Sequence, residues 1–167
     1  MPSTRAVVAL HHTGLTVSNL ARSLAFYRDL LGCEVIATQE KTGGYLAAIV
    51  GYPDAHVRMA HLRAPESDHI LELFEYITPT PTRSEIEPRN IGTAHVCFVV
   101  SGLWAVYERL LAAGVSSFLS PPVDVDTGVN TGGRGLYLRD PDRIIVELFE
   151  PPSDVAVGAS QSHRTSP

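Results

Sequence analysis

The chain has 167 residues, the size of one ordinary domain or of two small modules that share a core. Apolar residues make up 44% and charged residues 19%, a composition that excludes a chain disordered throughout. With 13 Lys and Arg against 18 Asp and Glu, a net charge of -5 and no basic block, the chain is not expected to bind nucleic acid or an anionic membrane. Its apolar runs are too short to cross a bilayer and its N-terminus has no room for a signal segment, so we expect a cytoplasmic protein.

The first half of the chain is predicted to form a strand, a helix and then further strands. Apolar residues recur at helical spacing from Leu20 to Leu31, with Ser18 as the predicted N-cap and Gly32 as the stop. Segment 43–51 could be a strand, but a short inserted helix preserves the match with the second half. The expected strands are 10–17, 33–40, 56–63 and 69–76.

A proline-rich stretch separates the two halves. The segment 79–88 contains three prolines, Pro79, Pro81 and Pro88, together with Thr and Ser, which is typical of a loop. We therefore predict a linker over 79–91 that joins a first module at 8–78 to a second module at 92–151.

The second half repeats the order of the first. A helix is predicted from Leu103 to Gly114 with Ser101 as its N-cap, and 121–133 is predicted to be a Gly- and Asp-rich loop. The segment 152–167 turns small and polar, and we expect a disordered tail. The expected strands are 93–100, 116–120, 134–139 and 143–150.

An internal duplication is the most informative feature of the sequence. In each half a His leads the repeated motif in the first predicted strand, at His12 and at His95, and Val, Ser and Leu follow it at the same offsets. The tetrapeptide Glu-Leu-Phe-Glu occurs in the last strand of both halves, beginning at Glu72 and at Glu147.

These duplicated residues include good metal ligands. Side chains alternate between the faces of a strand, so Glu72 and Glu147 point away from their apolar neighbours, and a carboxylate there is costly to bury unless it is paired or coordinated. Two-fold symmetry would bring both Glu and both His onto one surface, a set that suits a divalent first-row metal. Any one of the four is more often a packing or surface residue, and duplication alone could preserve the pattern, but their matched placement favours a metal site.

The sequence resembles the vicinal oxygen chelate superfamily, which includes glyoxalase I, methylmalonyl-CoA epimerase, extradiol dioxygenases and bleomycin-binding proteins. The resemblance implies an α+β fold in which two tandem βαβββ modules form a curved mixed sheet around a metal site. By the family pattern the ligands are His12, Glu72, His95 and Glu147. The residues that carry the resemblance are Leu10–Val17, Ser23–Tyr27, Leu30–Gly32, Ile70–Leu73, Gly92–Val96, Leu138–Asp142 and Ile145–Leu148.

The resemblance implies a metal-dependent lyase or isomerase of the glyoxalase and epimerase type. Such an enzyme removes a proton next to a carbonyl through a metal-stabilised enolate. By the resemblance Glu147 is the expected base and Glu72 its partner on the opposite side of the substrate. We expect one divalent ion per site, which could be Zn, Ni, Co, Mn or Fe, a small-molecule substrate and a homodimer.

Two alternatives stay open. A non-haem iron dioxygenase of the extradiol type would use His12, His95 and Glu147 as its triad, and Tyr137 with the following Asp-Pro partly follows that signature. Against it, Arg143 stands where Gly or Pro is usual, and no His occurs at 128–130. The second alternative is a metal-free binding or antibiotic-resistance protein, although such proteins usually lack the intact ligand set.

The remaining titratable residues are expected to have structural roles. His11 should point away from His12, and Glu75 and Glu150 should be solvated on the face opposite the ligands. Free buried thiols are expected at Cys33 and Cys97. The His residues without a His counterpart in the other half are interpreted as surface or packing residues: His56, His61, His69 and His163.

Overall fold

A computed structural model describes residues 6–153 of the chain, which divides into two compact units, Met1–Pro81 and Thr82–Pro167. The boundary between the units lies inside the predicted linker 79–91. Each unit contains a four-stranded mixed sheet with few helices, so the predicted α+β class is confirmed. All but the first two residues of the predicted tail 152–167 lie outside the described residues, as does His163. Within residues 6–153 no helix has the length and apolar character needed to cross a membrane.

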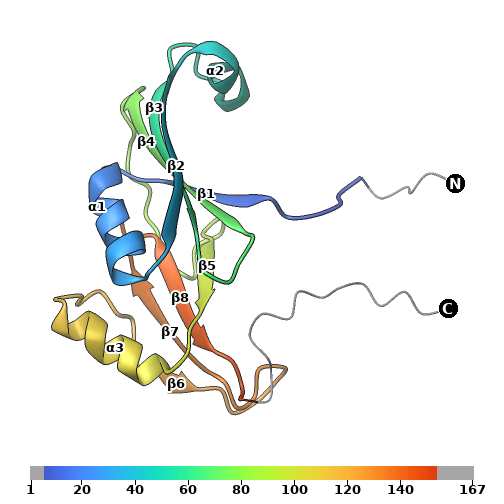
Figure 1. Ribbon diagram of the computed structural model, residues 1–167, viewed down its shortest axis with the longest axis vertical. Coiled ribbons are helices and arrows are strands. Elements are labelled where there is room, and N and C mark those ends of the chain that lie inside the picture. Colours follow the sequence, from blue (N-terminus) through green and yellow to red (C-terminus); the bar gives the residue numbers. More distant parts are fainter. Residues whose placement is uncertain (1–5, 154–167) are drawn as a thin grey trace, which may run out of the picture. The chain divides into compact units, whose positions relative to one another are not determined.

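The first unit has one parallel and two antiparallel strand pairs in the order β1-β4-β3-β2 (Figure 1). The parallel pair is β1 with β4, so the first strand of the repeat lies beside its last strand. The helical segment after β1 begins as an α-helix and continues as a π-helix. The elements are β1 (His12–Thr16), α1 (Leu20–Leu24), η1 (Ala25–Leu30), β2 (Glu34–Thr42), α2 (Gly44–Val50), β3 (His56–Arg63) and β4 (Ile70–Thr78).

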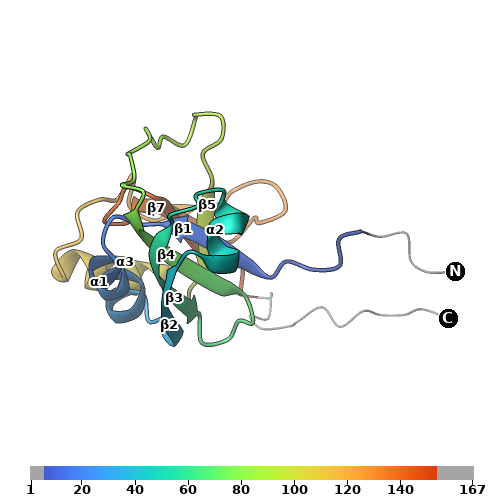
Figure 2. The same cartoon turned by 90° about the horizontal axis from the view of Figure 1, so that it is seen from above.

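The first sheet buries apolar side chains on both of its faces. On one face Leu71 and Leu73 of β4 are buried, and α1 packs on β3 and β4. The predicted inserted helix is confirmed as α2 (Figure 2). Its Leu46 and Ala47 form a cluster with β3 residues and with Phe74. Because Phe74 is two residues after Glu72 on β4, α2 packs on the sheet face that carries Glu72.

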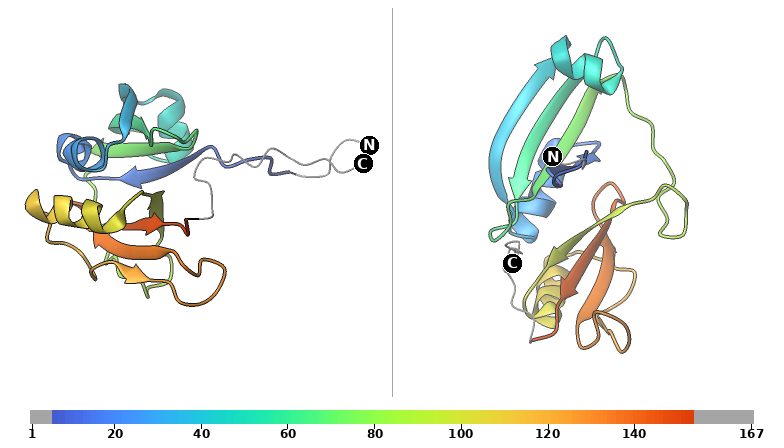
Figure 3. Two further views of the ribbon diagram at one scale, coloured as in Figure 1. Left: turned by 60° about the horizontal axis from the view of Figure 1, so that its bottom comes forward. Right: turned by 90° about the vertical axis from the view of Figure 1, so that its right-hand side faces the viewer.

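The second unit repeats this topology in the order β5-β8-β7-β6, with β5 parallel to β8. Helix α3 lies along one face of this sheet (Figure 3). Its Leu103 and Leu110 are fully buried. Burial of each such Leu contributes roughly 1.5–3 kcal/mol. The elements are β5 (His95–Val99), α3 (Leu103–Ala112), β6 (Val123–Asp124), β7 (Arg134–Arg139) and β8 (Ile145–Glu150).

The strand predicted at 116–120 is wrong. Only an isolated bridge forms there, between Phe118 and Leu138, and the short strand β6 follows at Val123–Asp124. Two consecutive prolines, Pro121 and Pro122, lack the N–H groups that a continued ladder would need. The edge of the second sheet is therefore broken into a bridge and a two-residue strand.

Both predicted N-caps are wrong by one residue. Helix α1 is capped by Asn19, whose side chain accepts a hydrogen bond of 2.8 Å from the N–H of Arg22. Helix α3 begins after Gly102, which adopts a left-handed backbone with φ of 69° and has no side chain to cap the helix. Gly32 and Gly114 have φ of 82° and 86°, as the predicted helix stops require.

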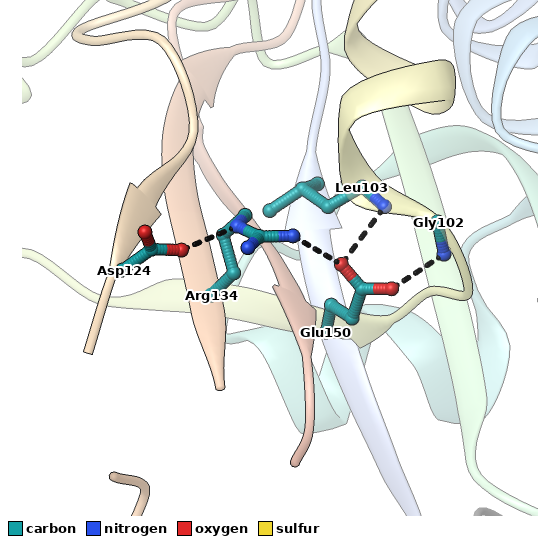
Figure 4. A network of polar contacts seen from close by, with 5 residues as sticks. All are labelled: Gly102, Leu103, Asp124, Arg134 and Glu150. Atoms are coloured by element: carbon teal, nitrogen blue, oxygen red, sulfur yellow. Dashed lines mark hydrogen bonds and ion pairs between the residues drawn. The ribbon is translucent and has the colours of Figure 1, made fainter. Parts of the chain in front are cut away.

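A strand residue caps α3 in place of the missing side chain. The carboxylate of Glu150 accepts hydrogen bonds from the N–H groups of Gly102 and Leu103, and Arg134 lies between Glu150 and Asp124 (Figure 4). The expectation that Glu150 is solvated is therefore wrong. It is wrong also for Glu75, whose side chain is only 14% exposed and lies 4.0 Å from the Arg58 guanidinium.

Candidate functional site

Strand pairing in the first unit brings His12 and Glu72 together. In the parallel ladder Gly14 is level with Glu72, and His12 lies two residues earlier on the same face of β1. The Nε2 atom of His12 is 3.4 Å from Oε2 of Glu72. The Glu72 side chain is 14% exposed, so this carboxylate is largely shielded from water, whereas the His12 side chain is 44% exposed.

The second unit forms the equivalent pair. Cys97 is level with Glu147 in the parallel ladder, and His95 lies two residues earlier on β5. The Nε2 atom of His95 is 3.1 Å from Oε2 of Glu147. The four residues predicted as a set thus occur as two His–Glu pairs with the same strand offset, one in each unit.

Two further side chains lie at equivalent places beside these pairs. His61 is the partner of Glu72 across the antiparallel β3–β4 ladder, and its Nε2 is 3.0 Å from Oε1 of Glu72. Tyr137 is the partner of Glu147 across β7–β8, and its hydroxyl lies 3.4 Å from Nε2 of His95. His61 was expected to be a surface or packing residue because no His occupies the equivalent place in the second half. The equivalent residue there is Tyr137, and the equivalence is visible only in the pairing of the strands.

The expected orientation of His11 is wrong. Its Nδ1 lies 2.8 Å from Nδ1 of His12, with the two rings edge to face at a centroid distance of 5.1 Å. His11 precedes the first residue of β1, so the alternation of a strand does not govern its side chain. The contact occupies Nδ1 of His12 and leaves Nε2 toward Glu72.

The two thiols differ from each other. Cys33 is buried as expected, and burial raises its pKa to about 11. Cys97 is an exposed residue, so its predicted burial is wrong. Atoms around its sulfur still desolvate it, and this desolvation, followed by the charge of Glu147 and a hydrogen bond to that carboxylate, raises the pKa of the Cys97 thiol to about 12. Both thiols are therefore protonated near neutral pH, and neither is a reactive thiolate.

The phenol of Tyr137 is also held in its protonated form. Desolvation is the main cause of its raised pKa, followed by electrostatic interactions with Glu147 and with Cys97. The 3.4 Å contact between Tyr137 and Nε2 of His95 is therefore made by a protonated hydroxyl.

The donor atoms of the two pairs fit a divalent first-row metal. Imidazole nitrogen suits Zn, Cu, Fe and Ni, and carboxylate oxygen suits Mg, Ca and Mn, so a mixed His and Glu set accepts a range of such ions. In residues 6–153 the His, Cys, Asp and Glu side chains form no group of three or more that is arranged for a metal ion.

The sequence of residues 9–148 matches the family model of the Glyoxalase/Bleomycin resistance protein/Dioxygenase superfamily. The chain belongs to this superfamily. The match spans both units and both His–Glu pairs, in agreement with the resemblance drawn from the sequence motifs.

Individual members of the superfamily are similar to this chain over most of its length. The 2-epi-5-epi-valiolone epimerase of Actinomyces sp is 29% identical over 87% of this chain and 81% of its own. The lactoylglutathione lyase of Salmonella typhimurium is 28% identical over 84% of this chain and 91% of its own. Among solved structures, a glyoxalase family protein from Bacillus cereus has a TM-score of 0.75 at 20% identity, covering 90% of this chain and 98% of its own, which supports the fold alone.

Proposed function

We propose that this protein is a divalent-metal-dependent lyase or isomerase of the glyoxalase and epimerase type, acting on a small molecule with neighbouring oxygen atoms. The observation that carries the proposal is the duplicated His–Glu pair at matched strand positions, with His–Glu distances of 3.4 Å and 3.1 Å. The relatives named as an epimerase and as a lyase support the reaction class.

The proposed ligands are two imidazoles and two carboxylates, from His12, Glu72, His95 and Glu147. When bound, a divalent ion would supply Lewis-acid polarisation of a substrate carbonyl and so acidify the neighbouring C–H bond. The mixed nitrogen and oxygen set is compatible with zinc, nickel, cobalt, manganese or iron.

The proton transfer is assigned to the carboxylates. Glu147 takes the proton from the carbon next to the carbonyl, and the electrons of that C–H bond move into the carbonyl to give an enolate. Return of a proton to a carbon atom completes an isomerisation without net redox change, and Glu72 is the proposed partner on the other side of the substrate. The Glu147 side chain is 23% exposed, so it is partly desolvated and still accessible.

A dioxygenase is a second candidate because of one contact. Tyr137, which partly matches the extradiol signature, lies 3.4 Å from the proposed ligand His95. Native iron together with substrate-dependent oxygen uptake would favour this candidate over the proton-transfer reaction.

Metal loading followed by a proton-exchange assay tests the proposal. The purified protein would be analysed for metal, stripped with a chelator and reloaded with each of the five ions. The reloaded protein would then be incubated in deuterated water with lactoylglutathione and with 2-epi-5-epi-valiolone, the compounds in the names of its relatives. About one recoverable metal per chain and metal-dependent deuterium incorporation would support the proposal. A chain that takes up none of the ions would contradict it.

We also propose that the protein is a homodimer in solution. Light scattering coupled to size-exclusion chromatography tests this, and a mass of one chain at micromolar concentration would contradict it.

A further inference from the structure

His61 is a third side chain at the first His–Glu pair, and the proposed reaction does not use it. It lies on β3 directly across the ladder from Glu72 and is only 27% exposed. Its position follows from the strand register and from the alternation of β3, which places Ala60 and Leu62 in the core and His61 on the other face.

The two imidazoles next to Glu72 contact different oxygens of its carboxylate. His12 Nε2 lies 3.4 Å from Oε2, and His61 Nε2 lies 3.0 Å from Oε1. The neutral imidazole carries its proton on one ring nitrogen, and a proton on Nε2 of His61 suits the shorter contact. With Oε1 restrained by His61, the carboxylate presents Oε2 toward His12.

The second unit uses its equivalent position differently. Tyr137 occupies the place of His61 but contacts His95, the imidazole of the pair, at 3.4 Å. The first unit thus restrains its carboxylate and the second unit restrains its imidazole. In both units the residue opposite the Glu in the antiparallel ladder contacts a proposed ligand. This repetition indicates that residues at this ladder position orient the ligands.

We propose that His61 is a positioning residue that fixes the Glu72 carboxylate as a metal ligand through Oε2 without binding the metal itself. The proposal rests on the metal-dependent function proposed above. Partners that orient a ligating side chain raise metal affinity, and their loss typically costs about 10–100-fold in affinity.

Two substitutions of similar volume separate the N–H group from the bulk of the ring. His61→Leu fills the part-buried space but has no donor, whereas His61→Gln keeps an N–H donor near the position of Nε2. His56→Ala is the matched control, because His56 lies on the same strand with similar exposure, 30%, and pairs with Glu40 outside the site.

The readouts are the dissociation constants of Mn²⁺ and Co²⁺ for the full chain, the visible spectrum of the cobalt form, and thermal unfolding of each metal-free variant. We expect His61→Leu to weaken binding by about 10–100-fold, His61→Gln to stay within about threefold of wild type, and His56→Ala to leave it unchanged. The cobalt spectrum of His61→Gln should match that of wild type, because the ligand atoms are the same. If His61→Leu does not fold, His61→Ala takes its place.

Three results would overturn the inference. Unchanged affinity in His61→Leu would show that the contact is incidental. Weak binding in His61→Gln with an altered cobalt spectrum would make His61 a direct ligand. Wild-type protein that binds neither ion would contradict the proposed function and this inference together, whereas the first two results contradict the inference alone.

Discussion

The backbone N–H of Gly102 donates a 2.8 Å hydrogen bond to the carboxylate of Glu150, 48 residues further along the chain. The first turn of α3 therefore depends on a strand residue for its cap. In the first unit the equivalent helix has its own cap, Asn19, and the equivalent carboxylate, Glu75, faces Arg58. The two copies of Glu-Leu-Phe-Glu have thus acquired different structural roles at their second Glu.

Glu150→Ala is expected to lower the free energy of unfolding by about 1–2 kcal/mol, the usual cost of losing a helix N-cap. The matched control is Glu75→Ala, for which we expect less than about 1 kcal/mol, because its contact with Arg58 is long and partly exposed. Urea unfolding of both variants, with the slopes compared, measures the difference. Equal losses for the two variants would show that the cap does not stabilise the second unit.

Replacing both imidazoles of the proposed ligand set, His12→Ala together with His95→Ala, is expected to abolish tight metal binding. Each carboxylate would remain, but oxygen ligands alone bind first-row ions less tightly than a mixed set with imidazole nitrogen. Equilibrium dialysis against Co²⁺ or Mn²⁺ checks this, with His56→Ala as the control. Stoichiometric metal retained by the double variant would refute the ligand set.

Glu147→Gln is expected to slow metal-dependent proton exchange by about 10²–10⁴-fold, the usual contribution of a general base. An amide oxygen can still contact a metal but does not accept the substrate proton. Deuterium incorporation into a compound that the wild type exchanges would be measured at saturating metal, with Glu150→Gln as a control outside the proposed chemistry. Exchange near the wild-type rate in Glu147→Gln would assign the base elsewhere.

The buried thiol of Cys33 should make stability depend on alkaline pH. Burial raises its pKa in the folded state to about 11, from 9.0 without that burial. The folded state then holds the thiol proton more tightly than the unfolded state does. The contribution of Cys33 to the free energy of unfolding is therefore full below pH 9 and is lost as pH rises through about 11. The loss amounts to about 3 kcal/mol, since the shift is two pKa units and each unit is about 1.4 kcal/mol.

This pH dependence is measured best in a Cys97→Ala background, where one thiol titrates. The free energy of unfolding of that protein, minus that of the same protein with Cys33→Ala, should decrease as pH rises from 9 to 11. A difference that stays constant over this interval would mean that the Cys33 thiol is not desolvated in the folded protein.

The local pattern of the sequence was sufficient for most elements of the fold. Strand β7 and strand β3 match their predicted ranges at both ends, and the helix stops at Gly32 and Gly114 follow from their left-handed backbone. The strand predicted at 116–120 failed because the apolar run there is short and two prolines follow it. Apolar periodicity indicates that a segment can be a strand, but a ladder also requires a partner along its length.

The amino-acid pattern is enough to establish the duplication, the order of the elements and the residues that share a strand face with the His and Glu of each pair. These features depend on the two-residue and 3.6-residue periods, which are properties of the local backbone. Three contacts could be found only in the folded chain: His61 lies against Glu72, Tyr137 reaches His95, and Glu150 caps α3. Each of these contacts depends on strand register or on helix docking, and hydrogen bonding between distant segments sets both.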